Sequence, residues 1–242
     1  PSIEPLNNIN NITIQSLPSV YKRHQLLCVL FRLLEGLTVC NALFVSFYLP
    51  SVVPMRKGGS NSANTKMPLP KAPARIKVIS IGSGAVGKSC LIKRYCEERF
   101  VSKYIATIGV DYGVKPVNID GTDVRVNFWD LSGHSEFFEV RNEFYKDAQG
   151  IVLVFDVGNK ESFDECDTWI SEAAKYGANP SDTPVVLCAN KTDKKRIVGT
   201  EEARSYASNR GMKYYETSAS SGQNVEDMFN DLFSSIIKDV NK

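Results

Sequence analysis

The sequence has only two histidines, and none of its six cysteines forms a Cys-x-x-Cys pair. We therefore expect no histidine-based metal site, and free thiols in a reducing compartment rather than a disulfide framework. Charge of one sign is also lacking, with 29 basic and 27 acidic residues in 242. Residues 1–74 hold seven of the basic and two of the acidic residues, so the rest of the chain is slightly acidic. Such a domain lacks the dense basic face that nucleic-acid binding requires.

An uninterrupted apolar run long enough to span a membrane is missing too. The apolar stretch at 26–48 contains Arg32 and Glu35, which would lie near the middle of a membrane span. Each charge there would raise the free energy of insertion by about 2.5–3.5 kcal/mol. The uncharged part, 36–49, is shorter than the ~20 residues that a spanning helix needs.

Two N-terminal segments precede the region with regular patterns. Three interpretations of residues 1–54 stay open: sequence outside a natural product that starts at Met55, a tether, or a disordered extension. Residues 55–74 are rich in Gly, Ser, Asn, Pro and Lys, which predicts a flexible linker.

From residue 75 to residue 242, strand-like and helix-like runs alternate. Strands are predicted at 75–81, about 110–118, about 124–130, 150–156, 184–190 and 213–216. Helices are predicted at about 87–97, 161–176, 199–209 and 223–240. This alternation predicts an α/β domain with a six-stranded, mostly parallel sheet flanked by about five helices.

A glycine-rich turn follows the first predicted strand and opens the first predicted helix. It matches the pattern GxxxxGK[ST] of a P-loop and consists of Gly82, Ser83, Gly84, Ala85, Val86, Gly87, Lys88 and Ser89, with Cys90 next. Glycines let backbone N–H groups curl around a phosphate, and the helix dipole adds to the attraction. Lys88 is expected to contact the β- and γ-phosphates, and the Ser89 hydroxyl to ligate Mg²⁺. Alone, the motif predicts a nucleoside triphosphate and leaves the base open.

The base is predicted from two later segments. Asn190, Lys191 and Asp193 follow a buried strand, at the edge where open α/β sheets bind ligands. A carboxylate at Asp193 can accept both the N1–H and the amino group of guanine, whereas adenine offers neither. After the last strand, Glu216-Thr-Ser-Ala would bring the Ala219 N–H to the guanine carbonyl, and we add its neighbours Ser218 and Ser220 to the site.

Three further positions complete the predicted nucleotide site. Asp130 ends a strand and can hold Mg²⁺ through water, while the N–H of Gly133 can reach the γ-phosphate. Thr107 lies between a helix and a strand, where its hydroxyl can ligate Mg²⁺ and its N–H can contact the γ-phosphate. Phe100 lies where an aromatic ring can cover the guanine edge.

Taken in order, these motifs resemble the Ras superfamily of P-loop small GTPases. The segments ATIGVDY (106–112) and QGIVLVFDV (149–157) are similar to Rabs. IKRYCEERFVSKYIATIGVDYGV and EVRNEFYKDAQG resemble RabJ, a Rab-like group that usually carries a C-terminal J-domain. The resemblance implies a GTP/GDP switch with Mg²⁺, acting as a monomer on protein effectors and regulators through two loops, at about 101–109 and 131–142. Exposed apolar residues in these loops are expected to form the effector surface: Ile105, Ile108, Phe137 and Phe138.

One position departs from the usual pattern of the superfamily. His134 follows Gly133 where Ras and Rabs place the glutamine that orients the attacking water. Imidazole lacks the paired donor and acceptor of an amide, so slow hydrolysis is expected, with His134, Lys88, Thr107 and Gly133 as the catalytic residues. Gly84 is expected to keep the space beside the reacting phosphate open. The alternative function is a GTP-loaded, non-catalytic interaction module, which the same binding residues would serve.

Features that Rabs and J-proteins usually carry are absent from these 242 residues. The last cysteine is Cys188, inside a predicted strand, so no prenyl anchor is expected. Neither His24 nor His134 is followed by Pro-Asp, so no J-domain motif is present. We expect a cytoplasmic location, with the nucleus as the alternative.

Overall fold

The computed structural model describes residues 74–240. The predictions for residues 1–54 lie outside the described residues, and so does the predicted linker except for Ala74, which begins the first strand. Within 74–240, no helix combines the length and the apolar character that crossing a membrane demands.

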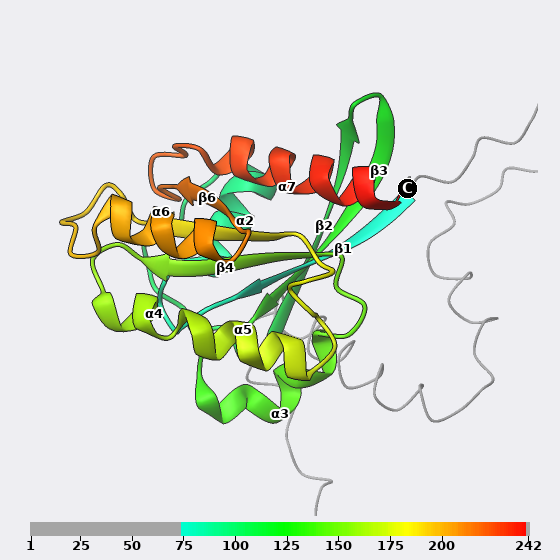
Figure 1. Ribbon diagram of the computed structural model, residues 1–242. Coiled ribbons are helices and arrows are strands. Elements are labelled where there is room, and N and C mark those ends of the chain that lie inside the picture. Colours follow the sequence, from blue (N-terminus) through cyan, green and yellow to red (C-terminus); the bar gives the residue numbers. More distant parts are fainter. Residues whose placement is uncertain (1–73, 241–242) are drawn as a thin grey trace, which may run out of the picture. The chain divides into compact units, whose positions relative to one another are not determined.

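A single six-stranded sheet forms the centre of the domain (Figure 1). Its strands are β1 (Ala74–Ile81), β2 (Val110–Ile119), β3 (Thr122–Leu131), β4 (Gly150–Asp156), β5 (Val185–Asn190) and β6 (Lys213–Glu216). The spatial order is β2-β3-β1-β4-β5-β6, and only the β2–β3 pair is antiparallel. The predicted α/β class and the mostly parallel sheet are therefore confirmed, and each strand lies within three residues of its predicted bounds.

The helices follow the prediction with two corrections. They are α2 (Lys88–Glu97), α3 (Phe138–Arg141), α4 (Lys160–Asp164), α5 (Cys166–Lys175), α6 (Thr200–Asn209) and α7 (Val225–Val240). The single helix predicted at 161–176 is wrong, because the chain is interrupted at Glu165, whose ψ of −6° lies outside the helical value. The sequence pattern also missed α3 and the 3₁₀ turns on either side of it, η2 (Ser135–Phe137) and η3 (Asn142–Phe144).

Each face of the sheet carries its own apolar core. On one face α2 and α7 pack on the strands through a cluster of aromatic rings that includes Tyr95, Phe128, Phe229 and Phe233. On the other face α4, α5 and α6 cover Ile79, Leu153 and Leu187 among others. Figure 1 shows α7 and α5 on opposite sides of the sheet. Since β4 and β5 are buried on both faces, their sequences are continuous apolar runs rather than alternating ones.

Loops that leave the carboxyl ends of the parallel strands gather at one edge of the sheet. The loop after β1 runs into α2, the loop after β3 holds 132–137, and the loops after β5 and β6 hold 191–199 and 217–224. Ligands of open α/β sheets bind at this edge, next to a strand where the connections turn to opposite sides. β1 is such a strand, because β3 flanks it on one side and β4 on the other.

Candidate functional site

The turn between β1 and α2 requires glycine at two positions. Gly82 has φ of +132°, and a Cβ there would lie 2.1 Å from the Val154 carbonyl oxygen. Gly87 has φ of +100°, and a Cβ there would lie 2.4 Å from the Asn190 amide nitrogen. Both backbone angles are rare for residues with side chains, so the turn can have this shape only with glycine. The N–H groups at the start of α2, with no helical partners of their own, are suited to bind an anion.

Lys88, the first residue of α2, is almost fully buried in the same turn. Its Nζ donates to the carbonyl oxygens of Gly82, at 2.5 Å, and Ser83, at 2.8 Å. Burial lowers the pKa of Lys88 to about 8, although the nearby Asp130 carboxylate opposes the shift. An ammonium held in a low-dielectric turn is a strong partner for an anionic phosphate.

Three oxygen groups from three elements converge beside Lys88. The Asp130 carboxylate, at the end of β3, accepts hydrogen bonds from Ser89 Oγ and, at 3.2 Å, from Thr107 Oγ1. The two hydroxyl oxygens lie 3.0 Å apart, and Ser80 Oγ donates to the other oxygen of Asp130 at 2.8 Å. Burial raises the pKa of Asp130, although Lys88 and the hydroxyl donors oppose the shift.

This arrangement fits the predicted Mg²⁺ site. Hard oxygen ligands suit Mg²⁺, which takes few ligands from the protein and shares the rest with water and phosphate. A divalent cation would also give the buried Asp130 carboxylate a positive counter-charge. Among residues 74–240, no cluster of three or more His, Cys, Asp or Glu side chains is placed to hold a metal ion. When bound, Mg²⁺ neutralises charge on the phosphate oxygens.

Asn190, the last residue of β5, joins three loops at the sheet edge. Its amide nitrogen donates to the Val86 carbonyl oxygen at 2.8 Å, and its amide oxygen accepts from Thr217 Oγ1 and the Ala219 N–H at 3.3 Å each. Because Asn190 is buried, each of these bonds forms away from water. The geometry agrees with the predicted tying role of Asn190, while the predicted contact of Ala219 with the base stays a prediction.

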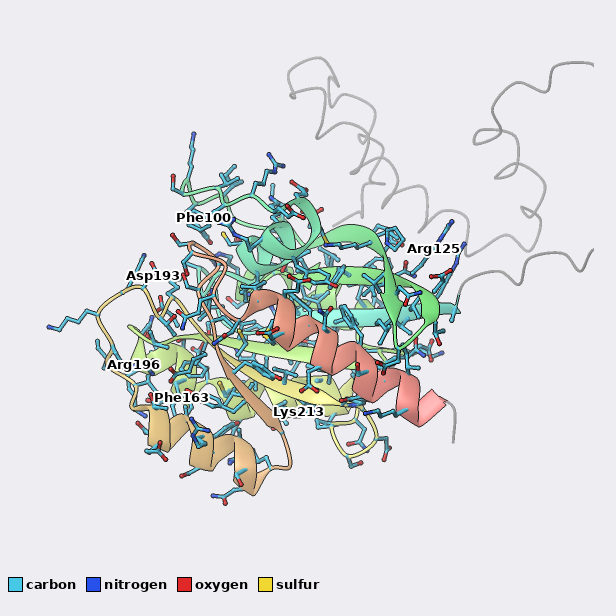
Figure 2. All side chains as sticks on the ribbon, turned by 90° about the horizontal axis from the view of Figure 1, so that it is seen from above. Phe100, Arg125, Phe163, Asp193, Arg196 and Lys213 are labelled. Atoms are coloured by element: carbon cyan, nitrogen blue, oxygen red, sulfur yellow. The ribbon has the colours of Figure 1, made fainter. Side chains whose placement is uncertain are left out.

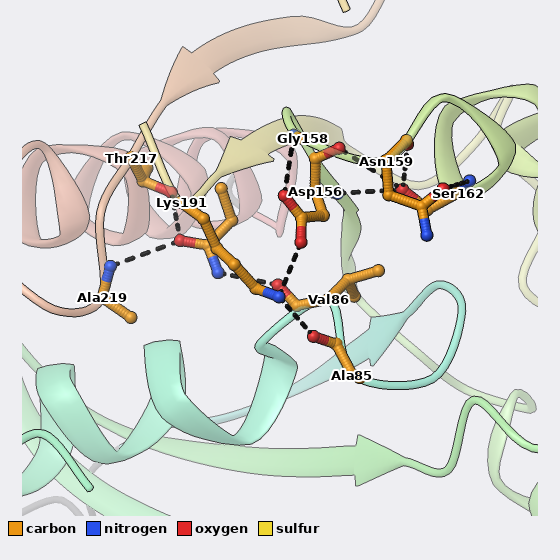
Figure 3. Close-up of polar contacts among 10 residues, drawn as sticks. Ala85, Val86, Asp156, Gly158, Asn159, Ser162, Lys191, Thr217 and Ala219 are labelled. Atoms are coloured by element: carbon orange, nitrogen blue, oxygen red, sulfur yellow. Dashed lines mark hydrogen bonds and ion pairs between the residues drawn. The ribbon is translucent and has the colours of Figure 1, made fainter. Parts of the chain in front are cut away.

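Lys191, the residue after Asn190, links the glycine-rich turn to the end of β4. Its Nζ donates to the Ala85 carbonyl oxygen at 2.7 Å and pairs with the Asp156 carboxylate at 2.6 Å (Figure 3). Asp156 ends β4, and its other carboxylate oxygen accepts from the Gly158 N–H at 2.8 Å. Asp156 was not predicted from the sequence, although its position at the carboxyl end of a buried strand is the kind of signal that singled out Asn190 and Asp130.

Asp193 and Ser218 lie together where the base is predicted to bind. Ser218 Oγ donates to Asp193 Oδ1 at 2.6 Å, so Ser218 orients this carboxylate from behind. Arg94 of α2 holds the adjacent loop, because its Nε and Nη2 donate to the carbonyl oxygens of Ala219, at 2.8 Å, and Ser220, at 2.6 Å. Arg94 was not predicted from the sequence, since a basic residue on an amphipathic helix usually faces solvent.

The structure corrects the expectation for Gly84. Gly84 leaves no open space, because the imidazole of His134 fills it: a Cβ on Gly84 would lie 2.9 Å from His134 Cε1. His134 Nε2 also lies 2.9 Å from the hydroxyl of Tyr104, in the loop before β2. Gly133 approaches the turn as well, since a Cβ on it would lie 2.4 Å from the Ser83 carbonyl carbon. Tyr104 was not predicted from the sequence, which singled out Phe100, Ile105, Thr107 and Ile108 in and near this loop.

A buried ion pair holds the backbone at His134. Arg141 donates through Nη1 to the carbonyl oxygen of His134 at 2.7 Å and pairs with Glu172 of α5 at 2.6 Å. Tyr145 donates to the same carboxylate at 2.6 Å. Burial raises the pKa of Glu172, but hydrogen bonds from Arg141 and Tyr145 outweigh it and hold that pKa below its ordinary value. This pair fixes the loop after β3 against α5.

Most of the predicted site residues line one cavity of about 260 Å³. On its wall are Gly84, Ala85, Gly87, Lys88, Ser89, Cys90, Phe100, Thr107, Gly133, His134, Asn190, Lys191, Asp193, Ala219 and Ser220. Five other predicted residues do not line it: Gly82, Ser83, Val86, Asp130 and Ser218. Figure 2 shows Phe100 and Asp193 at one end of the domain and Arg125 at the other. The cavity thus joins a phosphate-like cradle to a base-like carboxylate, as a nucleotide requires.

Part of the predicted effector surface is also corrected. Ile105 and Ile108 are 55% and 62% exposed, as expected. Phe138 is only half-exposed, because its ring packs edge-on against Tyr176 with a 5.6 Å centroid distance. Phe137 is half-exposed as well. Phe138 begins α3, and its ring lies against Tyr176 at the carboxyl end of α5.

Comparisons with known proteins agree with this geometry. Residues 77–238 match the model of the Ras family. The chain is 53% identical over 171 residues to "DnaJ homolog subfamily C member 27" of Danio rerio, which covers 69% of this chain and 63% of the relative. The protein of the same name from Rattus norvegicus is 50% identical over 183 residues, 74% of this chain and 66% of the relative.

The match to the relatives is partial in length. The chain spans slightly less than two thirds of these relatives, and their names contain DnaJ, which confirms the resemblance to RabJ. Members of the Ras family bind GTP or GDP with Mg²⁺, and the cradle, oxygen cluster and base-edge carboxylate fit both ligands. From its glycine-rich turn to its last helix, the chain belongs to the Ras family of small GTPases.

Proposed function

We propose that this protein is a GTP/GDP switch with slow intrinsic hydrolysis, because His134 occupies the position of the water-orienting glutamine. The supporting observation is the placement of its imidazole. The ring lies against Gly84, and its Nε2 is engaged by the Tyr104 hydroxyl at 2.9 Å. A glutamine amide offers a donor and an acceptor on one rigid group, so it can hold a water in two ways at once.

The chain's own residues have separate tasks in this proposal. Lys88 and the N–H groups of the turn bind the phosphates, and Ser89, Thr107 and Asp130 hold the cation. Asp193, oriented by Ser218, reads the base. Asn190 and Arg94 hold the loops that carry these groups at fixed separations. His134 stands at the position from which the attacking water would be oriented. Its hydrogen bond to Tyr104 leaves its imidazole poorly suited to that task.

The proposed partner surface lies at the mouth of the cavity. Ile105 and Ile108 are exposed large apolar residues beside Thr107. Val140 of α3 is 39% exposed, and its Cγ1 would lie 3.2 Å from a Cβ built on Gly109. Loops that a bound γ-phosphate orders through Thr107 and Gly133 would move these side chains, so partners could distinguish the GTP from the GDP form. We propose protein effectors and regulators as the partners.

Single-turnover hydrolysis tests the proposed slow switch. The full chain is preloaded with GTP, and phosphate release is compared between the wild type and His134→Gln. We expect the variant to be at least about tenfold faster, which corresponds to about 1.4 kcal/mol of barrier. Release of labelled GDP from both proteins serves as the control, since it reports binding and should stay equal.

The outcomes separate the candidate functions. A wild type that hydrolyses as fast as His134→Gln contradicts the slow switch, because histidine would then replace glutamine fully. A wild type and a variant that both show no hydrolysis would favour the GTP-loaded interaction module instead.

A further inference from the structure

The contact between Tyr104 and His134 links two loops across the cavity mouth. Tyr104 belongs to the loop before β2 and His134 to the loop after β3, and both residues line the cavity. Their hydroxyl and Nε2 lie 2.9 Å apart. We propose that Tyr104 is a positioning residue that holds the His134 ring against Gly84 with its Nε2 occupied, so that the ring cannot orient the attacking water, and thereby slows hydrolysis further. This inference rests on the proposed function of the site.

The contact depends on the hydroxyl group rather than on ring packing. Tyr104 is 58% exposed, so its ring buries little apolar surface. Within residues 74–240, its hydroxyl has no hydrogen-bond partner other than His134. A change from tyrosine to phenylalanine therefore removes the contact and leaves the packing of the loop nearly unaltered.

His134 is held at both ends. Its backbone carbonyl oxygen accepts from the buried Arg141 at 2.7 Å, and its N–H donates to Ser132 Oγ at 3.4 Å. Its ring fits into the space left by the missing side chain of Gly84. With the backbone fixed in this way, the Tyr104 hydroxyl is the group that decides whether the ring can turn away from Gly84.

The direction of this bond decides where the ring hydrogen lies. A neutral imidazole has one donor and one acceptor nitrogen. When the Tyr104 hydroxyl donates to Nε2, the ring hydrogen resides on Nδ1 and Nε2 has no lone pair left for a water. Loss of the hydroxyl frees Nε2 and lets the ring leave the wall of the turn.

A double-mutant cycle tests whether Tyr104 acts through His134. Single-turnover hydrolysis is measured for Tyr104→Phe in the wild-type chain and in a His134→Ala chain. We expect Tyr104→Phe to speed hydrolysis about two- to tenfold in the first, the range of one net hydrogen bond, and to have no effect in the second. Tyr112→Phe, at another exposed tyrosine whose hydroxyl has no such contact, is the matched control and should leave the rate unchanged.

Two results of the cycle would overturn the inference. An unchanged or slower rate in Tyr104→Phe means that the hydroxyl does not restrain His134. An equal acceleration in the His134→Ala chain means that Tyr104 acts elsewhere. Neither result depends on the comparison of His134→Gln with the wild type. That comparison tests the proposed slow switch, so the two proposals can fail independently.

A measurement without GTP gives a second readout. The chain has only two histidines, so ¹⁵N-histidine labelling gives one set of ring signals for His24 and one for His134, and the spectrum of His134→Ala assigns them. In nucleotide-free protein, Tyr104→Phe should shift the Nε2 signal of His134 and leave that of His24 in place. An unchanged His134 signal would show that no hydroxyl–imidazole bond exists in solution.

Discussion

At the scale of single residues, glycines decide the shape of the phosphate cradle. Gly87 combines a positive φ of +100° with a neighbouring buried amide, because a Cβ would lie 2.4 Å from Asn190 Nδ2. That amide donates to Val86 and ties β5 to the turn. Gly211 also has a positive φ, of +67°, but nothing lies within 4 Å of a Cβ built there. Comparing substitutions at Gly87 and Gly211 therefore separates the cost of a positive φ from the cost of a steric clash with Asn190.

We expect Gly87→Ala to destabilise the nucleotide-free protein by about 3 kcal/mol, and Gly211→Ala by about 1 kcal/mol. Both variants bear the strain of a positive φ, about 1–2 kcal/mol. Only Gly87→Ala also displaces Asn190 and leaves a buried amide unsatisfied, at about 1–3 kcal/mol. Urea unfolding of the two variants and wild type measures the difference. Equal losses would mean that Asn190 moves without consequence and that the turn is held by other contacts.

At the scale of elements, helix α5 is the support for the loop that carries His134. It presents Glu172 to Arg141 in a pair whose side chains are only 13% and 6% exposed. It also presents Trp169, whose ring faces the Arg141 guanidinium at 4.7 Å and whose Nε1 donates to Ser83 Oγ at 3.3 Å. One helix thus contacts both the phosphate turn and the loop after β3, and it fixes their separation.

The buried Arg141–Glu172 pair should contribute far more to the free energy of unfolding than the exposed Arg210–Asp167 pair on the same helix. Arg141→Ala leaves the Glu172 carboxylate buried without its guanidinium, at about 3–5 kcal/mol. Arg210→Ala removes a partner of Asp167, also on α5, but its side chains are 36% and 61% exposed, so the loss should be about 0–1 kcal/mol. Urea unfolding at pH 7 compares the two variants.

The pH dependence of the destabilisation by Arg141→Ala tests whether it arises from the unpaired charge of Glu172. In the wild type the pKa of Glu172 is held below its ordinary value, so its contribution is present above about pH 4.3 and lost as pH falls through the folded pKa. In Arg141→Ala the carboxyl can take up a proton and lose its unpaired charge. The destabilisation should therefore shrink between pH 7 and pH 4. A difference that stays constant over this range would contradict a charge-based role and point to lost packing of Arg141 on Trp169.

At the scale of the whole molecule, sequence periodicity predicted the sheet and most helices because buried parallel strands are continuous apolar runs. It failed at 135–144 and at Glu165, where short turns leave no period to detect. The motif residues were predicted from local patterns, and the structure brings them to one cavity. Three residues that hold them, Arg94, Tyr104 and Arg141, were not predictable in this way, because none belongs to a local motif that indicates its partner. Asp156 was also missed, although its place at the end of a buried strand was a usable signal.

The cavity is built from loops that follow four different strands, so a ligand bound there should stabilise the whole domain. A ligand that binds only the folded state adds about 4.1 kcal/mol of stability at a thousand times its Kd. We expect the Tm to be highest with GDP and Mg²⁺, lower with GDP and EDTA, because the oxygen cluster at Asp130 then lacks its cation, and lowest without nucleotide. ATP with Mg²⁺ should leave the Tm near the nucleotide-free value, since adenine has no donors for Asp193. Thermal unfolding of the full chain in the four conditions measures this order. If ATP raised the Tm as much as GDP, Asp193 would not select the base, and the nucleotide specificity proposed for this cavity would be wrong.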